Sequence, residues 1–277
     1  MLQNSAMLAN LNIRTWSARK LDRSVSAEVD VAHSAQDGGR YNKLLINKTA
    51  LDPLTKHAGK VREYHYATTL PWGDNGDRLL PAKQYMDYTA AMRSFKDESD
   101  KLTAKFVADY PTLVSDARTR LGTLYDAHDY PDVSDISGRF GLVVGFMPVP
   151  DAADFRVDVG AEALEEIKRS INASVNERQA GAVKECWARL YDVVNKLVVM
   201  MEKEKPIFRD SIIENVTGLI DMLPNLNITN DADLNTACSN VKFTMDYSPH
   251  ELRKNPKARA KLARDMGVVL QFIARNK

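Results

Sequence analysis

The segment from Lys56 to Arg93 reads KHAGKVREYHYATTLPWGDNGDRLLPAKQYMDYTAAMR, and the expected fold is built outward from it. Just upstream, Asp52 has the character of a helix N-cap. Pro53 fits the first helical position, where its missing amide proton costs no hydrogen bond. One face of this helix would carry Leu54, Ala58, Val61 and His65. Because Pro71 to Arg78 is rich in turn residues, the helix should end before Pro71 and lead into a polar tip.

A second helical arm is expected to begin near Pro81. Its apolar stripe repeats at alternating spacings of three and four, through Tyr85, Tyr88, Met92, Phe95, Ser99, Leu102 and Phe106. We expect this helix to run to about Asp109, with Pro111 restarting the chain as a third helix. The apolar residues of that helix would be Leu113, Ala117, Leu121 and Leu124. These segments together predict an antiparallel helical pair.

Short strands are expected on both sides of the helical arms. Leu11 to Trp16 alternates apolar and polar residues, and so do Phe140 to Phe146 and Phe155 to Val159. Between the first of these and the first arm, Leu21, Val25 and Val29 recur every fourth residue and indicate a short helix. The strands predict a small antiparallel sheet, because an isolated hairpin is only marginally stable in water.

The C-terminal part of the chain should be helical. A long helix is expected from Ala161 to Lys203, either continuous or kinked near Gly181, and further helices over Phe208 to Leu223 and Ala232 to Asn240. Two start signals follow. Ser248, Pro249 and Glu251 form a capping box, and Asn255 with Pro256 repeats the cap and proline. The apolar stripe of the last helix would be Leu262, Met266, Val269 and Ile273.

The resulting fold class is α+β and mainly α, with long antiparallel helices and a small antiparallel β-sheet. We divide the chain into a mixed region over residues 1–160, which holds the basic and aromatic stretch, and a helical region over residues 161–277. The alternative is one single domain.

Composition sets limits on location and partners. The net charge is +1 over 277 residues, so no overall field favours nucleic acid or a membrane surface. No apolar run approaches the ~20 residues of a membrane helix, and no secretory signal is recognisable. The two cysteines, Cys186 and Cys238, are too isolated for a disulfide framework or a zinc site, so we expect buried thiols. These features predict a cytoplasmic protein.

Local clusters of cations and flat rings are the candidate binding surfaces. Cations neutralise phosphates and exposed rings stack on bases, so the segment from Lys56 to Arg93 is a candidate site for a single-stranded nucleic acid. Tyr66 and Trp72 would stack on bases, and the final helix would add phosphate contacts. The full candidate set is Lys60, Arg62, Tyr66, Trp72, Arg78, Lys83, Lys257, Arg259 and Lys261.

A structural interpretation of the same residues stays open. Tyr85 and Tyr88 fit the apolar stripe of their helix, which favours a place in the core, and Tyr64 is open to the same interpretation. The cations would then be ordinary helix surface, and the basic face of the last helix would be solvated.

Catalytic and metal-binding patterns are not recognisable. The aspartates at 74 and 77, and at 151, 154 and 158, lack the spacing of a calcium loop. The five histidines are scattered, and there is no nucleophile motif, phosphate-binding glycine loop or dinucleotide fingerprint. We therefore expect no enzyme activity, no catalytic residue, no metal and no cofactor.

Three segments carry a resemblance to a known group of proteins. They are Thr69 to Pro81 (TLPWGDNGDRLLP), Asp109 to Val114 (DYPTLV), and Pro148 to Pro150 together with Asp154 to Val159 (DFRVDV). In these the chain resembles a family of proteins of unknown function encoded by tailed bacteriophages and prophages. The resemblance implies a viral origin and action in the bacterial host cytoplasm, and it supplies no catalytic residues.

Two functional hypotheses follow. The first is a phage-encoded single-stranded DNA-binding protein that acts in genome replication or recombination. The second is a non-enzymatic helical protein-interaction module, an adaptor or inhibitor that engages a host or phage protein. Such a module would be a possible homo-oligomer through the long helix from Ala161 to Lys203.

Overall fold

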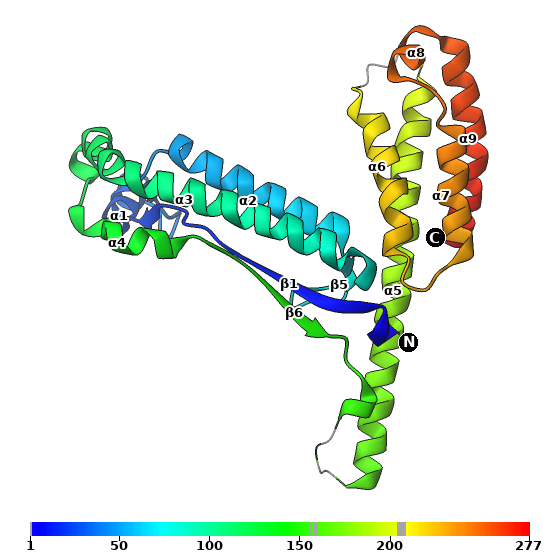
Figure 1. Cartoon of the computed structure of the whole chain (residues 1–277). Coiled ribbons are helices and arrows are strands. Elements are labelled where there is room, and N and C mark those ends of the chain that lie inside the picture. Colours follow the sequence, from blue (N-terminus) through cyan, green and yellow to red (C-terminus); the bar gives the residue numbers. More distant parts are fainter. Residues whose placement is uncertain (1, 156, 158–159, 204–208) are drawn as a thin grey trace. The chain divides into compact units, whose positions relative to one another are not determined.

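A computed structural model describes residues 2–155, 157, 160–203 and 209–277 (Figure 1). The chain forms two compact units, each assembled from separated stretches. Unit 1 comprises Met1–Asn10, Tyr66–Tyr88 and Gly145–Lys277, and unit 2 comprises Leu11–His65 and Thr89–Val144. These units do not coincide with the expected division at residue 160, because residues 66–88 pack with the C-terminal helices.

Unit 1 contains most of a four-stranded sheet. Its strands are β1 (Ala6–Arg14), β4 (Leu70–Pro71), β5 (Asp77–Pro81) and β6 (Gly141–Pro148), in the order β4-β5-β1-β6. β5 is antiparallel to β1, with Ala6 opposite Pro81 and Asn10 opposite Asp77. The expected small antiparallel sheet is confirmed, and the predicted polar tip is the hairpin connection between β4 and β5. Of the strand expected over Phe155 to Val159, residues 156, 158 and 159 lie outside the described residues, and Phe155 and Val157 are not in a strand.

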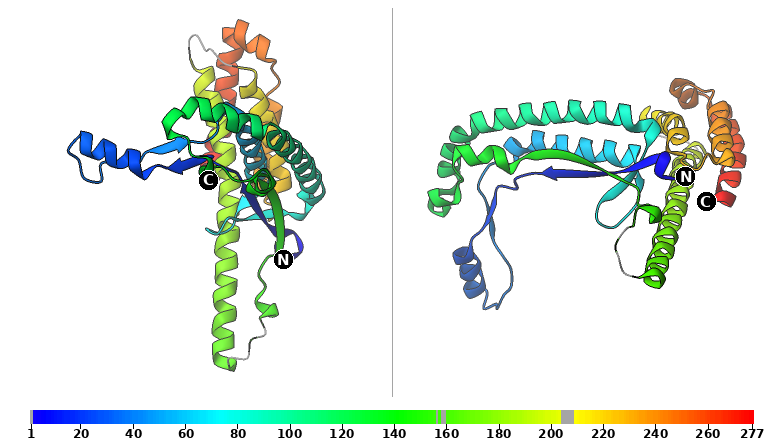
Figure 2. Two further views of the ribbon diagram at one scale, coloured as in Figure 1. Left: turned by 90° about the vertical axis from the view of Figure 1, so that its left-hand side faces the viewer. Right: turned by 60° about the horizontal axis from the view of Figure 1, so that its bottom comes forward.

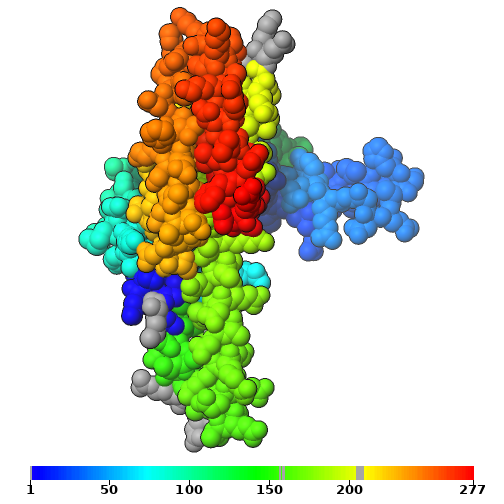
Figure 3. Space-filling model, turned by 90° about the vertical axis from the view of Figure 1, so that its right-hand side faces the viewer, coloured from blue at the N-terminus to red at the C-terminus, as the bar shows by residue number. Residues whose placement is uncertain are grey.

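The rest of unit 1 is a helical bundle. Its helices are α5 (Ala161–Met201), α6 (Ser211–Leu226), α7 (Ala232–Thr244), α8 (Pro249–Lys254) and α9 (Pro256–Asn276). α5 packs against α6, α7 and α9, and α7 packs beside α9 on one face of the bundle (Figure 3). Trp187, Leu190, Leu223 and Met266 are buried among these helices.

Several helix signals in the sequence are confirmed at atomic detail. The Ser248 side chain accepts from the Glu251 amide at 3.1 Å, and the Asn255 side chain accepts from the Lys257 amide at 3.0 Å. α5 is one helix through Gly181, as one of the two expected alternatives required. Phe208, the expected start of α6, lies outside the described residues.

Unit 2 is centred on α2 (Lys48–Thr68) and α3 (Tyr85–Leu121). Within this unit the two helices share an apolar cluster that includes Leu51, Leu54, Phe106 and Tyr110. Two expected boundaries are wrong, because α2 begins five residues before Pro53 and α3 continues through Pro111. Pro111 is exposed, so water can satisfy the carbonyl group that loses its helical partner there.

Unit 2 also contains a small hairpin with a helix inserted between its strands. It comprises β2 (Arg19–Leu21), α1 (Arg23–Ala32) and β3 (Asn42–Leu44), and we call residues 19–44 the arm (Figure 2). β2 and β3 are antiparallel, with Lys20 opposite Lys43. The expected short helix is confirmed in α1, which contains no buried residue.

Short helical turns complete the chain: η1 (Leu2–Asn4), η2 (Ala82–Gln84), η3 (Gly122–Leu124), η4 (Ala127–Asp129), α4 (Val133–Ile136), η5 (Ser137–Arg139) and η6 (Ala152–Asp154). Among the described residues, no helix has the length and apolar character needed to cross a membrane.

Candidate functional site

Trp72 lies in the core of unit 1. Its side chain is 5% exposed and belongs to the same buried cluster as Leu70 and Leu79. The guanidinium carbon of Arg178 lies 5.6 Å from the centroid of the indole ring. The expectation that Trp72 offers an exposed stacking ring is therefore wrong. The physical reason is that β4 packs against α5, which encloses the indole.

Arg78 is committed to the structure of unit 1. Its Nε donates to Thr69 Oγ1 at 2.7 Å, and a terminal nitrogen donates to the Thr69 carbonyl at 3.1 Å. Arg189 donates to the same carbonyl at 3.0 Å, and burial together with the Arg189 charge lowers the pKa of Arg78. The Tyr66 ring is 53% exposed and lies 4.8 Å from the guanidinium carbon of Arg78. Of this pair, the tyrosine offers the more accessible surface.

The remaining cations of the candidate stretch are exposed but are divided between the units. Lys60 and Arg62 lie on the part of α2 that belongs to unit 2, and Lys83 lies on η2 in unit 1. Of these cations, Lys83 therefore shares unit 1 with Tyr66 and Trp72, whereas Lys60 and Arg62 belong to unit 2.

The candidate residues near the C-terminus differ in their exposure. Arg259 is 6% exposed and donates to the carbonyl groups of Leu252 at 2.9 Å and Arg253 at 3.3 Å. It ties the end of α8 to α9, so its expected role as a phosphate contact is wrong. Lys257 and Lys261 are exposed on α9 and remain candidates.

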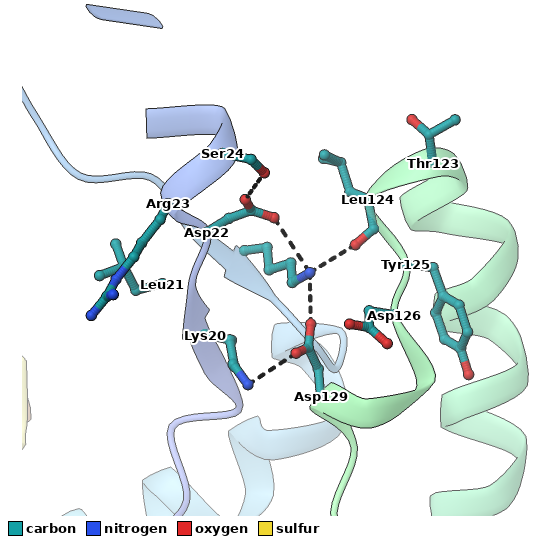
Figure 4. A pocket seen from close by; sticks show the side chains of 11 residues that line it. Lys20, Leu21, Asp22, Arg23, Ser24, Thr123, Leu124, Tyr125, Asp126 and Asp129 are labelled. Carbon is teal, nitrogen blue, oxygen red and sulfur yellow. Dashed lines mark hydrogen bonds and ion pairs between the residues drawn. The ribbon is translucent and has the colours of Figure 1, made fainter. Parts of the chain in front are cut away.

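A charged joint at the base of the arm was not expected from the sequence. The Lys43 side chain is 8% exposed, and its Nζ lies 2.6 Å from Asp129 Oδ2 and 3.4 Å from Asp22 Oδ2. The same Nζ donates to the Leu124 carbonyl at 2.9 Å, and Lys20 Nζ lies 3.0 Å from Asp129 Oδ1 (Figure 4). The residues of this joint are far apart along the chain, so no local pattern groups them. The sequence offers one signal for the joint, which is Asp22 after an apolar residue at the start of a helix.

The charges of this joint stabilise one another. Burial raises the pKa of Asp129, but hydrogen bonds and charges from Lys43 and Lys20 outweigh it and the pKa is lowered. The Ser24 hydroxyl and the Val25 amide lower the pKa of Asp22. Burial disfavours the charged form of Lys43, yet Asp129 and Asp22 outweigh it and raise the pKa. Lys43 is therefore a structural cation and not a neutral amine nucleophile.

The joint borders an open cavity of about 660 Å³. The lining is completed by Leu21, Arg23, Ser24, Thr123, Tyr125 and Asp126. Asp129 Oδ2 is buried, and the Lys43 Nζ at 2.6 Å compensates its charge. Because the buried charges at this cavity are already paired with one another, we interpret it as the attachment point of the arm.

The arm should loosen in acid. A carboxylate whose folded pKa is lowered contributes stability above its ordinary pKa of about 4, and this is lost as the pH falls through the folded value. Because the pKa of Lys43 is raised, its contribution to stability is kept until the pH rises above about 10.5. Hydrogen exchange of residues 19–44, corrected for intrinsic rates, should therefore show less protection at about pH 3 than at pH 7. Equal protection of residues 19–44 at the two pH values would contradict a stabilising role of the joint.

The other chemistry-bearing residues are buried or dispersed. Cys186 and Cys238 are buried and free, as expected, and burial raises their thiol pKa values to about 12 and about 11. Within the described ranges, no three His, Cys, Asp or Glu side chains are grouped so that they could hold a metal ion. The chain matches no protein-family model, no curated protein and no solved structure.

Proposed function

We propose that this chain is a non-enzymatic binding protein whose arm docks a protein partner. The observation that carries the proposal is α1, a ten-residue helix without a buried side chain. Val29 is 49% exposed and Val31 is 81% exposed. Two further apolar side chains of the arm, Tyr41 and Leu44, are also exposed.

The order of the arm rests on polar contacts. The Asp22 amide donates to the Tyr41 carbonyl at 2.9 Å, and the Tyr41 amide donates to Ser26 Oγ at 3.0 Å. The Gly38 amide donates to Asp30 Oδ1 at 3.1 Å, which closes the chain after α1. A helix this short and a two-stranded sheet are each marginal alone, and both normally depend on burying an apolar face. A partner surface is the natural cover for the apolar side chains of α1.

The pattern along α1 fits recognition of a helix by a groove. Val25, Val29 and Ala32 follow one another at spacings of four and three, which aligns them on one face. Glu28 flanks this face and is exposed. A matching partner would present an apolar groove with a basic rim, as in other helix-in-groove complexes.

The resemblance to phage and prophage proteins supports a proposal for the place of this contact. We place the partner in the bacterial host cytoplasm, as a host protein, a phage protein or a second copy of the chain. Binding then needs no catalytic group in the chain. The arm takes over the role that we first assigned to the helix from Ala161 to Lys203.

A photoreactive amino acid at position 32, on the same face as Val29, tests the proposal. With p-benzoylphenylalanine in place of exposed Ala32, irradiation of host cells should give one discrete protein adduct. Adding Val29→Asp should lower its yield at least tenfold, since burying a carboxylate in place of an apolar side chain costs well over the ~1.4 kcal/mol that a tenfold change represents.

The control places the same photoreactive group at Val133 of α4, which is 46% exposed and lies in the same unit. Adducts at both positions, or an adduct that persists with Val29→Asp, would show nonspecific contact and contradict the proposal. Circular dichroism should show that each variant keeps its helix content.

A further inference from the structure

A basic stripe runs along α9 in unit 1. Lys257, Lys261 and Arg264 are exposed and follow one another at spacings of four and three, so they share one helical face. We call these three residues the α9 stripe. Lys254, at the end of α8, is also exposed and precedes the stripe by three residues. In a chain with a net charge of +1, this is a local excess of positive charge.

The α9 stripe has no acidic partner in the described parts of the chain. Among the described residues, no ion pair within 4.0 Å involves Lys257, Lys261 or Arg264. By contrast, exposed Lys242 of α7 pairs with Asp221 at 2.8 Å, and Arg253 of α8 pairs with Asp210. The one acidic residue of α9, Asp265, is half-buried. The positive charge of the stripe is therefore available to an external anion.

The stripe lies on a well-fixed helix. The Asn255 side chain accepts from the Lys257 and Ala258 amides at 3.0 and 3.2 Å, and buried Arg259 joins α8 to α9. Leu262 and Met266 are fully buried beneath the stripe. At the helical rise, Lys257 and Arg264 lie about 10 Å apart along the axis. This matches roughly three phosphates of a stacked strand at about 3.4 Å each.

An exposed aromatic ring lies in the segment that leads to α8. Phe243 is 88% exposed near the C-terminal end of α7, and α7 packs beside α9 (Figure 3). A ring this exposed contributes almost nothing to the core. An unpaired base can stack on such a ring, whereas the bases of a duplex already stack on one another.

We infer that the α9 stripe binds the phosphate backbone of a single-stranded nucleic acid and that Phe243 stacks on one of its bases. The proposed site retains Lys257 and Lys261, which belong to the candidate set chosen from the sequence. It replaces the buried Trp72 with Phe243, which the sequence did not single out, and the buried Arg259 with Arg264 of the same basic cluster. The site shares no residue with the arm, so it and the protein-docking proposal can fail separately.

Fluorescence anisotropy of the full chain with a fluorescein-labelled 20-nucleotide thymidine strand tests the stripe. The triple variant Lys257→Gln, Lys261→Gln, Arg264→Gln should bind at least tenfold more weakly at low salt. The slope of log K against log salt should become shallower by about 2, as expected for three lost phosphate contacts. Lys196→Gln is the matched control, because Lys196 is exposed on α5 in the same unit and should bind as the wild type does.

The aromatic contact is tested by Phe243→Ala, which should weaken binding about tenfold, and by Phe243→Trp, which should restore it. Tighter binding of a duplex of the same length would overturn the single-strand assignment, and so would a Phe243→Ala variant that binds like the wild type. No binding at low salt, or equal binding by the triple variant, would overturn the inference as a whole.

Discussion

Trp72→Ala is expected to lower the free energy of unfolding of unit 1 by about 3–5 kcal/mol, the usual cost of removing a buried large aromatic side chain. The indole is 5% exposed in a cluster that also contains Leu70, Leu79 and Leu190. Truncation would leave a cavity between β4 and α5 and would also remove the ring that faces Arg178. Denaturant unfolding, followed by circular dichroism, gives the free energy directly.

Tyr66→Ala is the control for this prediction. Tyr66 is also aromatic and lies nearby in the sequence, but its ring is 53% exposed. Its loss should cost about 1 kcal/mol or less, mainly the contact with Arg78. If Trp72→Ala kept wild-type stability and instead lost nucleic-acid binding, the indole would be a stacking platform, as the sequence alone suggested.

Lys43→Met is expected to release the arm. The substitution keeps the length of the side chain but removes the cation between Asp22 and Asp129. It also leaves the Leu124 carbonyl without its donor. Breaking a fully enclosed ion pair costs about 3–5 kcal/mol. We expect about 2–3 kcal/mol here, because the joint borders an open cavity where water can partly solvate Asp129.

Hydrogen exchange should locate this effect in residues 19–44, with little change in α2 and α3. Lys20→Met is the matched control, because Lys20 also contacts Asp129 but is 53% exposed and should cost less than about 1 kcal/mol. Unchanged protection of the arm in Lys43→Met would refute the joint. The same variant should remove most of the acid sensitivity of the arm, because the carboxylates would lose their main cation.

Release of the arm would also affect its proposed partner. In Lys43→Met the apolar face of α1 remains intact in sequence but is no longer held in a fixed orientation. Photo-crosslinking from position 32 should therefore fall. In Val29→Asp the crosslinking yield should fall while the hydrogen-exchange protection of the arm is unchanged. The pair of variants separates the docking contact from the joint that supports it.

The sequence by itself determined those features of the fold that depend on residues close together in the chain. Ser248 and Asn255 begin helices because their side chains bond to amides two or three residues later, and such a signal is complete within one turn. The apolar spacing along α3 and α9 likewise predicted helices and their buried faces. The mainly helical fold class with a small antiparallel sheet followed from these local patterns.

Tertiary structure alone decided the environment of each side chain. Trp72 and Tyr66 look equally suited to stacking in the sequence, but only Trp72 is enclosed when β4 packs against α5. Pro111 looked like a break, yet the stripe on both sides of it shares one cluster and the helix continues. Lys43 and Asp129 are 86 positions apart and meet only after folding. Burial and ion pairing depend on which distant segments come together, and no local pattern records that.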